Sequence, residues 1–243
     1  MNKKDLTKDY NLKIKKLTEY NKFYYENSSP LVSDKAYDDL KGKILKLEKK
    51  YNFLNSELSP SKVVGYKPSK NFKKVKHRVK MLSLSNVFNE NDLVNFEKKI
   101  VNYLNISSDK IEYCVEPKID GISASLTYKN GKLISGVSRG DGDEGELITE
   151  NLKTISDIPS EIKDKNFPKD IDIRGEVFIK KNDFETLKEK FANPRNAASG
   201  SLRQKNSSET KKIPLKFIGY TFGFYKNNDL SKQSEFLENL NKW

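Results

Sequence analysis

The chain of 243 residues contains one cysteine, Cys114, and one histidine, His77. These counts exclude a disulfide or a multi-cysteine zinc site within the chain, and they favour a reducing cytosol. They also exclude a catalytic site that needs several imidazoles. The sequence has no signal peptide, no lipidation motif and no apolar run long enough to cross a bilayer. We therefore expect a cytoplasmic protein without a membrane partner.

The charge of the chain is strongly unbalanced. Lys and Arg together number 46 against 34 Asp and Glu, which gives a formal net charge of +12. Such an excess favours a polyanionic partner such as DNA or RNA. Because the chain is rich in Lys, Asn and Ile, biased composition is the alternative explanation. A hydrophobic content of 35% is sufficient for a real core.

The first third of the chain predicts a helical hairpin. Residues 5–27 carry apolar and aromatic residues at helical spacing, and Asn27-Ser28-Ser29-Pro30 ends the pattern. Ser33 is suited to cap a second helix from Asp34 to about Tyr51. The turn between them is flanked by aromatic residues and carboxylates, namely Tyr24, Tyr25, Asp34, Tyr37 and Asp38. This cluster could hold a flat ring and a ribose; aromatic packing, with carboxylates placed for the helix dipole, is the alternative.

A basic, loop-like stretch over residues 55–80 marks the boundary of this module. Its run from Lys73 to Arg78 could contact phosphate, or be merely solvated. Residues 81–88 alternate apolar residues with serines, as in a segment that lines a pocket. Asn89 is expected to cap a helix to about Leu104 whose inward residues are Leu93, Phe96, Ile100 and Tyr103.

The stretch that carries the chemistry is Glu116-Pro117-Lys118-Ile119-Asp120-Gly121. The β-branched and aromatic residues of 111–115 predict a buried strand that begins the main sheet, with Cys114 inside it. Lys118 then stands at a strand end beside Glu116 and Asp120. A lysine amine attacks phosphorus only when unprotonated, so a reactive lysine needs a site that lowers its pKa. We interpret Lys118 as a nucleophile that accepts a nucleotide; a solvated turn is the alternative.

The rest of the chain predicts further antiparallel strands with flanking helices. Residues 122–128 alternate apolar and small polar residues, Asn130-Gly131 is a hairpin turn, and residues 133–138 return. A hairpin after the nucleophile argues against a parallel doubly wound sheet. We expect a glycine-rich loop over 138–145, a helix over 146–155, strands over 171–179 and 215–225, and helices over 182–191 and 231–243. The fold class is α+β.

Other candidate site residues come from this second half. Glu176 alternates with apolar residues, so it could face the same pocket as Lys118, or be a plain surface glutamate. Arg139 belongs to the glycine-rich loop, which could wrap a ligand or be simply flexible. Arg195 and Arg203 could grip phosphates through two donors each.

Six blocks in order carry a resemblance that covers nearly the whole chain: residues 24–38, 81–84, 116–121, 138–142, 174–178 and 191–198. Together they resemble the N-terminal adenylation region of the NAD-dependent DNA ligase family. Lys-x-Asp-Gly is shared by all covalent nucleotidyltransferases, whereas the N-terminal tyrosine and aspartate module is peculiar to the branch that uses NAD. The resemblance implies a helical module over residues 1–65 that binds the nicotinamide mononucleotide (NMN) half of NAD. A nucleotidyltransferase domain over 66–243 follows, incomplete at its C-terminus.

The resemblance also implies a role for each matching residue. Lys118 would attack NAD to form lysine–AMP and release NMN, with Asp120 positioning the lysine. Glu116 would bind adenine, and Arg139 and Glu176 the ribose and phosphate. The rest of the NAD site would be Tyr24, Tyr25, Asp34, Lys35, Ala36, Tyr37, Asp38, Ser83 and Leu84. Arg195 and Arg203 would meet phosphate of the nucleotide or of nicked double-stranded DNA. Magnesium, or alternatively manganese, would neutralise phosphate charge during the attack on NAD. No zinc is expected in this chain.

The chain departs from the family pattern at Ser85, where Asp is common, and at Lys153, where Arg is usual. It also stops at Trp243, before the family's Asp-Gly-Val-Val-x-Lys block, so we expect either a fragment or a naturally short copy. The leading hypothesis is the self-adenylating part of a DNA ligase used in replication and repair, acting as a monomer. The alternative is a truncated fragment that binds NAD or DNA without completing ligation. The N-terminal module disfavours an RNA ligase or capping-type enzyme that uses ATP.

Overall fold

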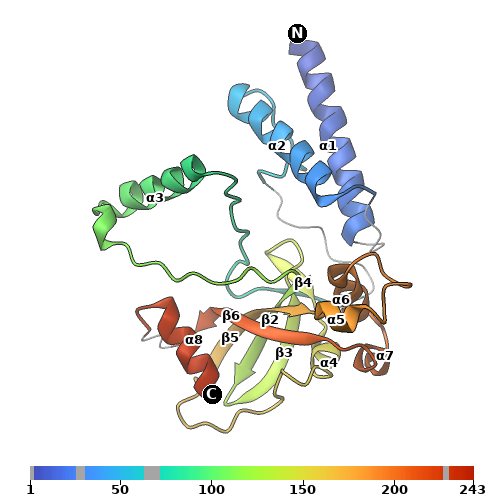
Figure 1. The fold of residues 1–243 in the computed structure, drawn as a ribbon, viewed down its shortest axis with the longest axis vertical. Coiled ribbons are helices and arrows are strands. Elements are labelled where there is room, and N and C mark those ends of the chain that lie inside the picture. Colours follow the sequence, from blue (N-terminus) through green and yellow to red (C-terminus); the bar gives the residue numbers. More distant parts are fainter. Residues whose placement is uncertain (1–2, 26–30, 63–71, 227–229) are drawn as a thin grey trace. The chain divides into compact units, whose positions relative to one another are not determined.

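The computed structural model describes residues 3–25, 31–62, 72–226 and 230–243. The chain divides into two compact units: Met1–Met81 with Ile119–Trp243, which we call the main unit, and Leu82–Lys118, which we call the 82–118 segment. Helices and antiparallel sheets both contribute (Figure 1), so the expected α+β class is confirmed.

The helical hairpin consists of α1 (Lys3–Tyr25) and α2 (Asp34–Lys50), as predicted. The Ser33 hydroxyl accepts a hydrogen bond from the Ala36 amide at 3.3 Å, which is the expected cap. A small core holds the two helices side by side (Figure 1), formed by the buried residues Tyr10, Ile14, Leu17, Ile44 and Leu54. The break predicted at residues 27–30 lies outside the described residues.

Four strands form the main sheet, in the order β3-β2-β5-β6, and every neighbouring pair is antiparallel. They are β2 (Ile122–Lys129), β3 (Lys132–Ser138), β5 (Asp170–Phe178) and β6 (Lys216–Tyr225). Asn130 and Gly131 link the first two with φ values of 48° and 77°. Two positive φ angles in a two-residue loop match the right-handed twist of the flanking strands, and the predicted hairpin is confirmed.

One face of this sheet is the hydrophobic core of the main unit. Along β5 the residues Ile171, Ile173 and Val177 are buried, and β2 adds Leu126 and Tyr128. The helices α4 (Thr149–Leu152), α6 (Pro194–Leu202) and α8 (Gln233–Lys242) contribute Leu152, Ala197, Ala198, Leu202 and Phe236 to the same core. The alternate residues of each strand therefore point to the opposite face.

Several boundaries differ from the sequence prediction. Residues 55–80 are not all loop, because β1 (Lys74–Lys76) pairs with β4 (Glu144–Glu146). The helix expected over 146–155 is shorter, since Glu146 is committed to β4 and only α4 is helical. Asn182 does not cap a helix to residue 191; it lies inside the short helix α5 (Lys181–Phe184). A further short helix of the main unit is α7 (Ser207–Lys211).

The 82–118 segment contains α3 (Glu90–Leu104) and the 3₁₀ turn η1 (Ser108–Lys110). Asn89 caps α3 as predicted, by accepting a hydrogen bond from the Asp92 amide at 3.0 Å. The predicted inward face is wrong: α3 has no buried residue, and Leu93, Phe96 and Tyr103 are 57%, 44% and 89% exposed. The amphipathic pattern is present, but none of the residues of α3 is buried.

The strand predicted over residues 111–115 is also wrong. No strand is assigned there, Val115 is 92% exposed, and Cys114 is an exposed free cysteine. A β-rich sequence becomes a strand only when a neighbouring strand satisfies its backbone, and the sheet instead begins at Ile122. Among the described helices, none is both long and apolar enough to cross a membrane.

Candidate functional site

The second face of the main sheet is a row of polar residues. Asp170, Asp172, Arg174 and Glu176 follow one another at every second position of β5, so all four lie on this face. β2 places Ser123 opposite Glu176 and Thr127 opposite Asp172. We call this surface the polar face. It answers the question that the sequence left open, because Glu176 is 8% exposed and is no plain surface glutamate.

The Glu176 carboxylate is the centre of this face. It accepts a hydrogen bond from the Ser123 hydroxyl at 2.8 Å. Burial raises the pKa of the Glu176 carboxyl above its usual range, whereas the hydrogen bond from Ser123 and the charges of Arg195 and Arg139 act in the opposite direction. A buried carboxylate between two arginines suits recognition of a polar ligand that carries both hydroxyl and phosphate groups.

Tyr220 joins this group through an irregularity of β6. Arg174 pairs with Thr221 and Gly175 pairs with Gly219, so Tyr220 is the extra residue of a β-bulge. A bulge redirects a side chain that would otherwise alternate. Burial raises the pKa of the Tyr220 hydroxyl, and Glu176, Ser123, Arg139 and Arg174 are all near enough to contribute to the shift.

Two of the predicted arginines form ion pairs. Arg195, in the first turn of α6, donates to the Asp120 carboxylate at 2.9 Å, and its charge also acts on Glu176. The main unit thus brings together four predicted site residues, Asp120, Arg139, Glu176 and Arg195. Arg203 is placed differently: its Nε donates at 2.9 Å to Glu146, which is 1% exposed, while 27% of the Arg203 side chain stays exposed.

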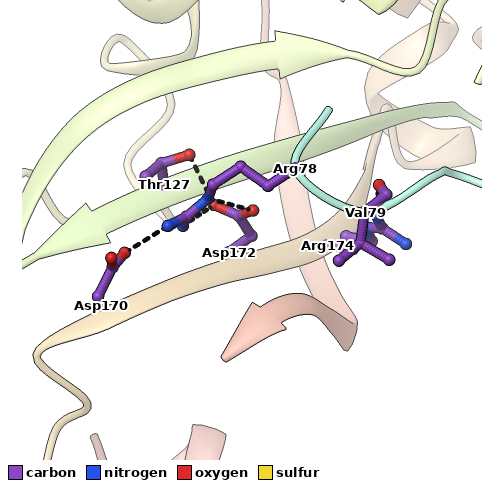
Figure 2. A network of polar contacts seen from close by, with 6 residues as sticks. All are labelled: Arg78, Val79, Thr127, Asp170, Asp172 and Arg174. Atoms are coloured by element: carbon purple, nitrogen blue, oxygen red, sulfur yellow. Dashed lines mark hydrogen bonds and ion pairs between the residues drawn. The ribbon is translucent and has the colours of Figure 1, made fainter. Parts of the chain in front are cut away.

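Arg78 covers the far end of the polar face (Figure 2). Its guanidinium binds both carboxylate oxygens of Asp172 and donates to Asp170 at 2.7 Å. Thr127 donates to the same Asp172 at 2.7 Å. The basic run was predicted as a phosphate contact or as solvated, but Arg78 serves the fold by neutralising the 4% exposed Asp172. Neighbouring Arg174 donates to the backbone carbonyls of Val79 and Lys80.

Sequence reasoning missed Ser123, Tyr220 and Arg174 as members of this site. The period-two spacing of charged residues over 170–176 was a signal that could have identified Arg174 together with Glu176. No comparable signal exists for Tyr220, because its orientation depends on the bulge.

The predicted residues of the 82–118 segment lie on exposed backbone without regular structure. Lys118, Glu116 and Ser83 are exposed, and Leu84 is 74% exposed. Cys114 donates a weak thiol hydrogen bond to the Glu116 carboxylate at 3.6 Å. Within this segment Lys118 is therefore exposed on backbone without regular structure.

In the helical hairpin, Tyr37 is half-buried and donates to the Asn21 side chain at 2.8 Å, which ties α2 to α1. Lys35, Ala36 and Asp38 are exposed on the first turns of α2. The side chains of Tyr24, Tyr25 and Asp34 lie outside the part of the chain that is described.

Among the described residues, no group of three or more His, Cys, Asp or Glu side chains is arranged to hold a metal ion. Magnesium needs no such cage when it arrives with a nucleotide, because phosphate oxygens and water supply most of its ligands. The donor set is therefore compatible with a phosphate-borne magnesium ion.

Comparison with known proteins accounts for both parts of this architecture. Residues 69–243 match the family model of the NAD-dependent DNA ligase adenylation domain, and residues 4–65 match that of a DNA ligase-like, N-terminal NAD+-binding domain. The chain thus consists of two ligase domains, the second an adenylation domain. It belongs to the NAD-dependent DNA ligase family.

Individual relatives support the same family assignment. The chain is 63% identical over its whole length to a DNA ligase of Pelagibacter ubique, of which it covers 36%. It is 44% identical over 93% of its length to a DNA ligase of Parvibaculum lavamentivorans, and 48% identical over 91% to one of Rickettsia bellii, covering 33% of each. The chain spans about a third of the length of the curated relatives it matches.

Proposed function

We propose that this chain carries out the first step of NAD-dependent DNA ligation, with Lys118 as the nucleophile. The observation that carries the proposal is the position of Lys118 in Glu116–Gly121 within a matched adenylation domain. The lone pair of Lys118 Nζ attacks the α-phosphorus of the AMP half of NAD. A phosphorus–nitrogen bond forms, the bond to the bridging oxygen breaks, NMN leaves, and the amine loses a proton.

The other predicted residues are assigned to the same reaction. Glu116 binds adenine, Arg139 and Glu176 hold the ribose and phosphate, and Asp120 positions Lys118. The grouping of Asp120, Arg139 and Arg195 around Glu176 supports the assignment of these residues to one ligand. Ser83 and Leu84 contribute to the NAD site. Magnesium, or manganese in its place, accompanies the nucleotide and neutralises phosphate charge.

Residues 1–65 are proposed as the module for the NMN half of NAD, through Tyr24, Tyr25 and the first turns of α2 from Asp34 to Asp38. The main support is the match to an NAD+-binding domain over residues 4–65. The hydrogen bond from Tyr37 to Asn21 holds α2 against α1, and the exposed Lys35 and Asp38 remain accessible to a ligand.

In the whole protein, AMP then passes to the 5′-phosphate of nicked double-stranded DNA and the nick is sealed, in replication and repair. The net charge of +12 supports a DNA partner, and Arg195 and Arg203 are the proposed phosphate contacts. Both arginines already hold carboxylates, so phosphate would share or replace those ion pairs. We propose a monomer in the cytoplasm, which the single free cysteine supports.

The decisive experiment is the intact mass of the chain after incubation with NAD and magnesium, with ATP in a parallel sample. A gain of one AMP with NAD alone supports the proposal. No gain in a folded sample that NAD nevertheless protects against unfolding favours the alternative, a fragment that binds NAD without reacting. A gain with ATP instead would overturn the assignment of the N-terminal module.

A further inference from the structure

Residues 77–81 form a short segment without regular secondary structure in the main unit, between two parts of the proposed site; we call it the strap. It follows β1 and is contacted on one side by the loop Arg139–Asp143 and on the other by the polar face of the sheet. Every contact that defines the strap is internal to the main unit.

On the loop side, the strap is bonded through its backbone at both ends. The His77 amide donates to the Asp143 carbonyl and the Met81 amide donates to the Gly142 carbonyl, each at 2.9 Å. Gly142 has a φ of +96°, and a Cβ there would stand 2.6 Å from the Met81 carbonyl oxygen. The close approach of the two segments therefore depends on a residue without a side chain.

The His77 ring makes the contact nearest to the site. Its Nε2 lies 3.1 Å from the carbonyl oxygen of Arg139. Because a carbonyl only accepts, Nε2 must carry the proton. Burial lowers the pKa of the His77 imidazole, so the neutral tautomer with its proton on Nε2 is favoured at neutral pH. The backbone amide of Arg139 is fixed as well, by donating to Ser123 at 3.1 Å.

On the sheet side, two arginines hold the strap in place. Arg78 is bound by Asp172 and Asp170, and its guanidinium also lies 4.2 Å from the centre of the Phe224 ring (Figure 2 shows the carboxylates). Arg174, two residues from Glu176 on the same strand, donates to the Val79 and Lys80 carbonyls. The strand that carries Glu176 thus also anchors the segment that bonds to Arg139.

We propose that His77 is a positioning residue for nucleotide binding, which fixes the Arg139 loop relative to Glu176 through its bond to the Arg139 carbonyl. The inference rests on the proposed function for the role of Arg139. His77 itself contacts no substrate in this arrangement. The loop passes through two positive-φ glycines, Gly140 and Gly142, which have no side chain to anchor it, so its position depends on restraint by hydrogen bonds to neighbouring segments. The strap supplies that restraint.

The test compares His77→Ala with His77→Gln, whose terminal amide can place a donor near the position of Nε2. AMP is the probe, because it lacks the NMN leaving group and so reports binding without reaction. We expect His77→Ala to weaken AMP binding roughly five- to tenfold, about the effect of one hydrogen bond, and His77→Gln to restore most of it. In adenylation by NAD, His77→Ala should raise KM more than it lowers kcat.

The matched control is Tyr128→Phe, which removes another side-chain bond to a backbone carbonyl, from Tyr128 to Pro159 at 2.7 Å, on the core face of the same sheet. It should lower the melting temperature without changing AMP affinity. If His77→Ala fails to fold, His77→Asn, whose amide is one methylene short of the carbonyl, takes its place. Equal AMP affinity of His77→Ala and the parent, or failure of His77→Gln to recover, would overturn the proposal.

Hydrogen exchange tests the restraint on the loop independently of nucleotide binding. The Met81 and Gly142 amides, which donate to Gly142 and Arg139 respectively, should exchange at least several-fold faster in His77→Ala than in the parent. If the parent itself does not bind AMP, the proposed function is wrong and the nucleotide role of His77 falls with it. Unchanged exchange would refute the restraint on the loop whether or not AMP binds.

Discussion

The polar face and the 82–118 segment both carry residues that we assign to NAD, but the two regions hold those residues in opposite ways. Glu176 is 8% exposed, accepts a bond from Ser123, and is placed by cross-strand register on a sheet with a complete core beneath it. Lys118 is exposed on irregular backbone, in a segment whose only α-helix buries no residue.

The two regions differ in how firmly they hold residues that we assign to one ligand, because the sheet rests on a core and α3 buries no residue. A rigid sheet suits a carboxylate and arginines that must present a fixed pattern to the nucleotide. A nucleophile must approach the phosphorus and later carry the bound AMP, and its segment has no core of its own that would fix it.

Lys118→Ala should abolish AMP attachment completely while leaving the fold intact. Because Lys118 is exposed, the change in the free energy of unfolding should stay within about 0.5 kcal/mol. Intact mass and a denaturant titration measure the two quantities. Lys110→Ala, another exposed lysine of the same segment, is the control and should still take AMP. An adduct on Lys118→Ala would show that another residue is the nucleophile.

Truncating a leucine in each region tests the difference in packing directly. Leu126 is 2% exposed in the core, and Leu126→Ala should lower the free energy of unfolding by about 2–5 kcal/mol. Leu93 on α3 is 57% exposed, and Leu93→Ala should change it by less than about 0.5 kcal/mol. Urea unfolding of both variants measures this. Comparable losses would mean that α3 is packed in solution, and they would contradict the difference in packing between the two regions.

Removing Arg78 tests how firmly the polar face depends on its ion pairs. Arg78→Met leaves Asp172, whose side chain is 5% exposed, without its charged partner, and should cost on the order of 2–4 kcal/mol. The neighbouring Lys80 forms an ion pair with Asp143 in which both side chains are 63% exposed, so Lys80→Met should cost less than about 1 kcal/mol. A small effect of Arg78→Met would show that water replaces the guanidinium.

Glu176→Gln should change the free energy of unfolding less than Leu126→Ala or Arg78→Met, and by an amount that depends on pH. Burial raises the folded pKa of Glu176 above its unfolded value of about 4.3. The cost of the buried ionised form is absent below the unfolded pKa and fully present above the folded pKa. The parent should therefore lose stability relative to the Gln variant as the pH rises through that window.

Thermal melts of the parent and Glu176→Gln at a series of pH values above about 4 would show this trend, since the variant lacks the titrating group. A difference that is independent of pH would contradict the raised pKa. The same variant should bind AMP more weakly than the parent at neutral pH. Greater stability combined with weaker binding is the mark of a residue kept for function at a cost in folding.

Local signals in the sequence were reliable where the structure is decided locally. Ser33 and Asn89 cap their helices, and Asn130-Gly131 forms the predicted turn, because capping and turn geometry depend on a few adjacent residues. The six sequence blocks, taken in order, likewise identified the family before any geometry was known. The alternation of charged and apolar residues over 170–176 also predicted a polar face, although only Glu176 was named from it as a candidate site residue.

The tertiary structure decided what depends on distant partners. Residues 111–115 have the composition of a strand but lack a neighbour in the sheet, and α3 has an apolar face that its own segment does not cover. In the sequence, Arg78 is one charge in a basic run. In the structure it binds Asp172, which is 94 residues away. The sequence determined the family and the local elements, and it carried the proposal that Lys118 is the nucleophile. Only long-range pairing decided which charges are buried together, because the free energy of a buried charge is set by the partners that surround it.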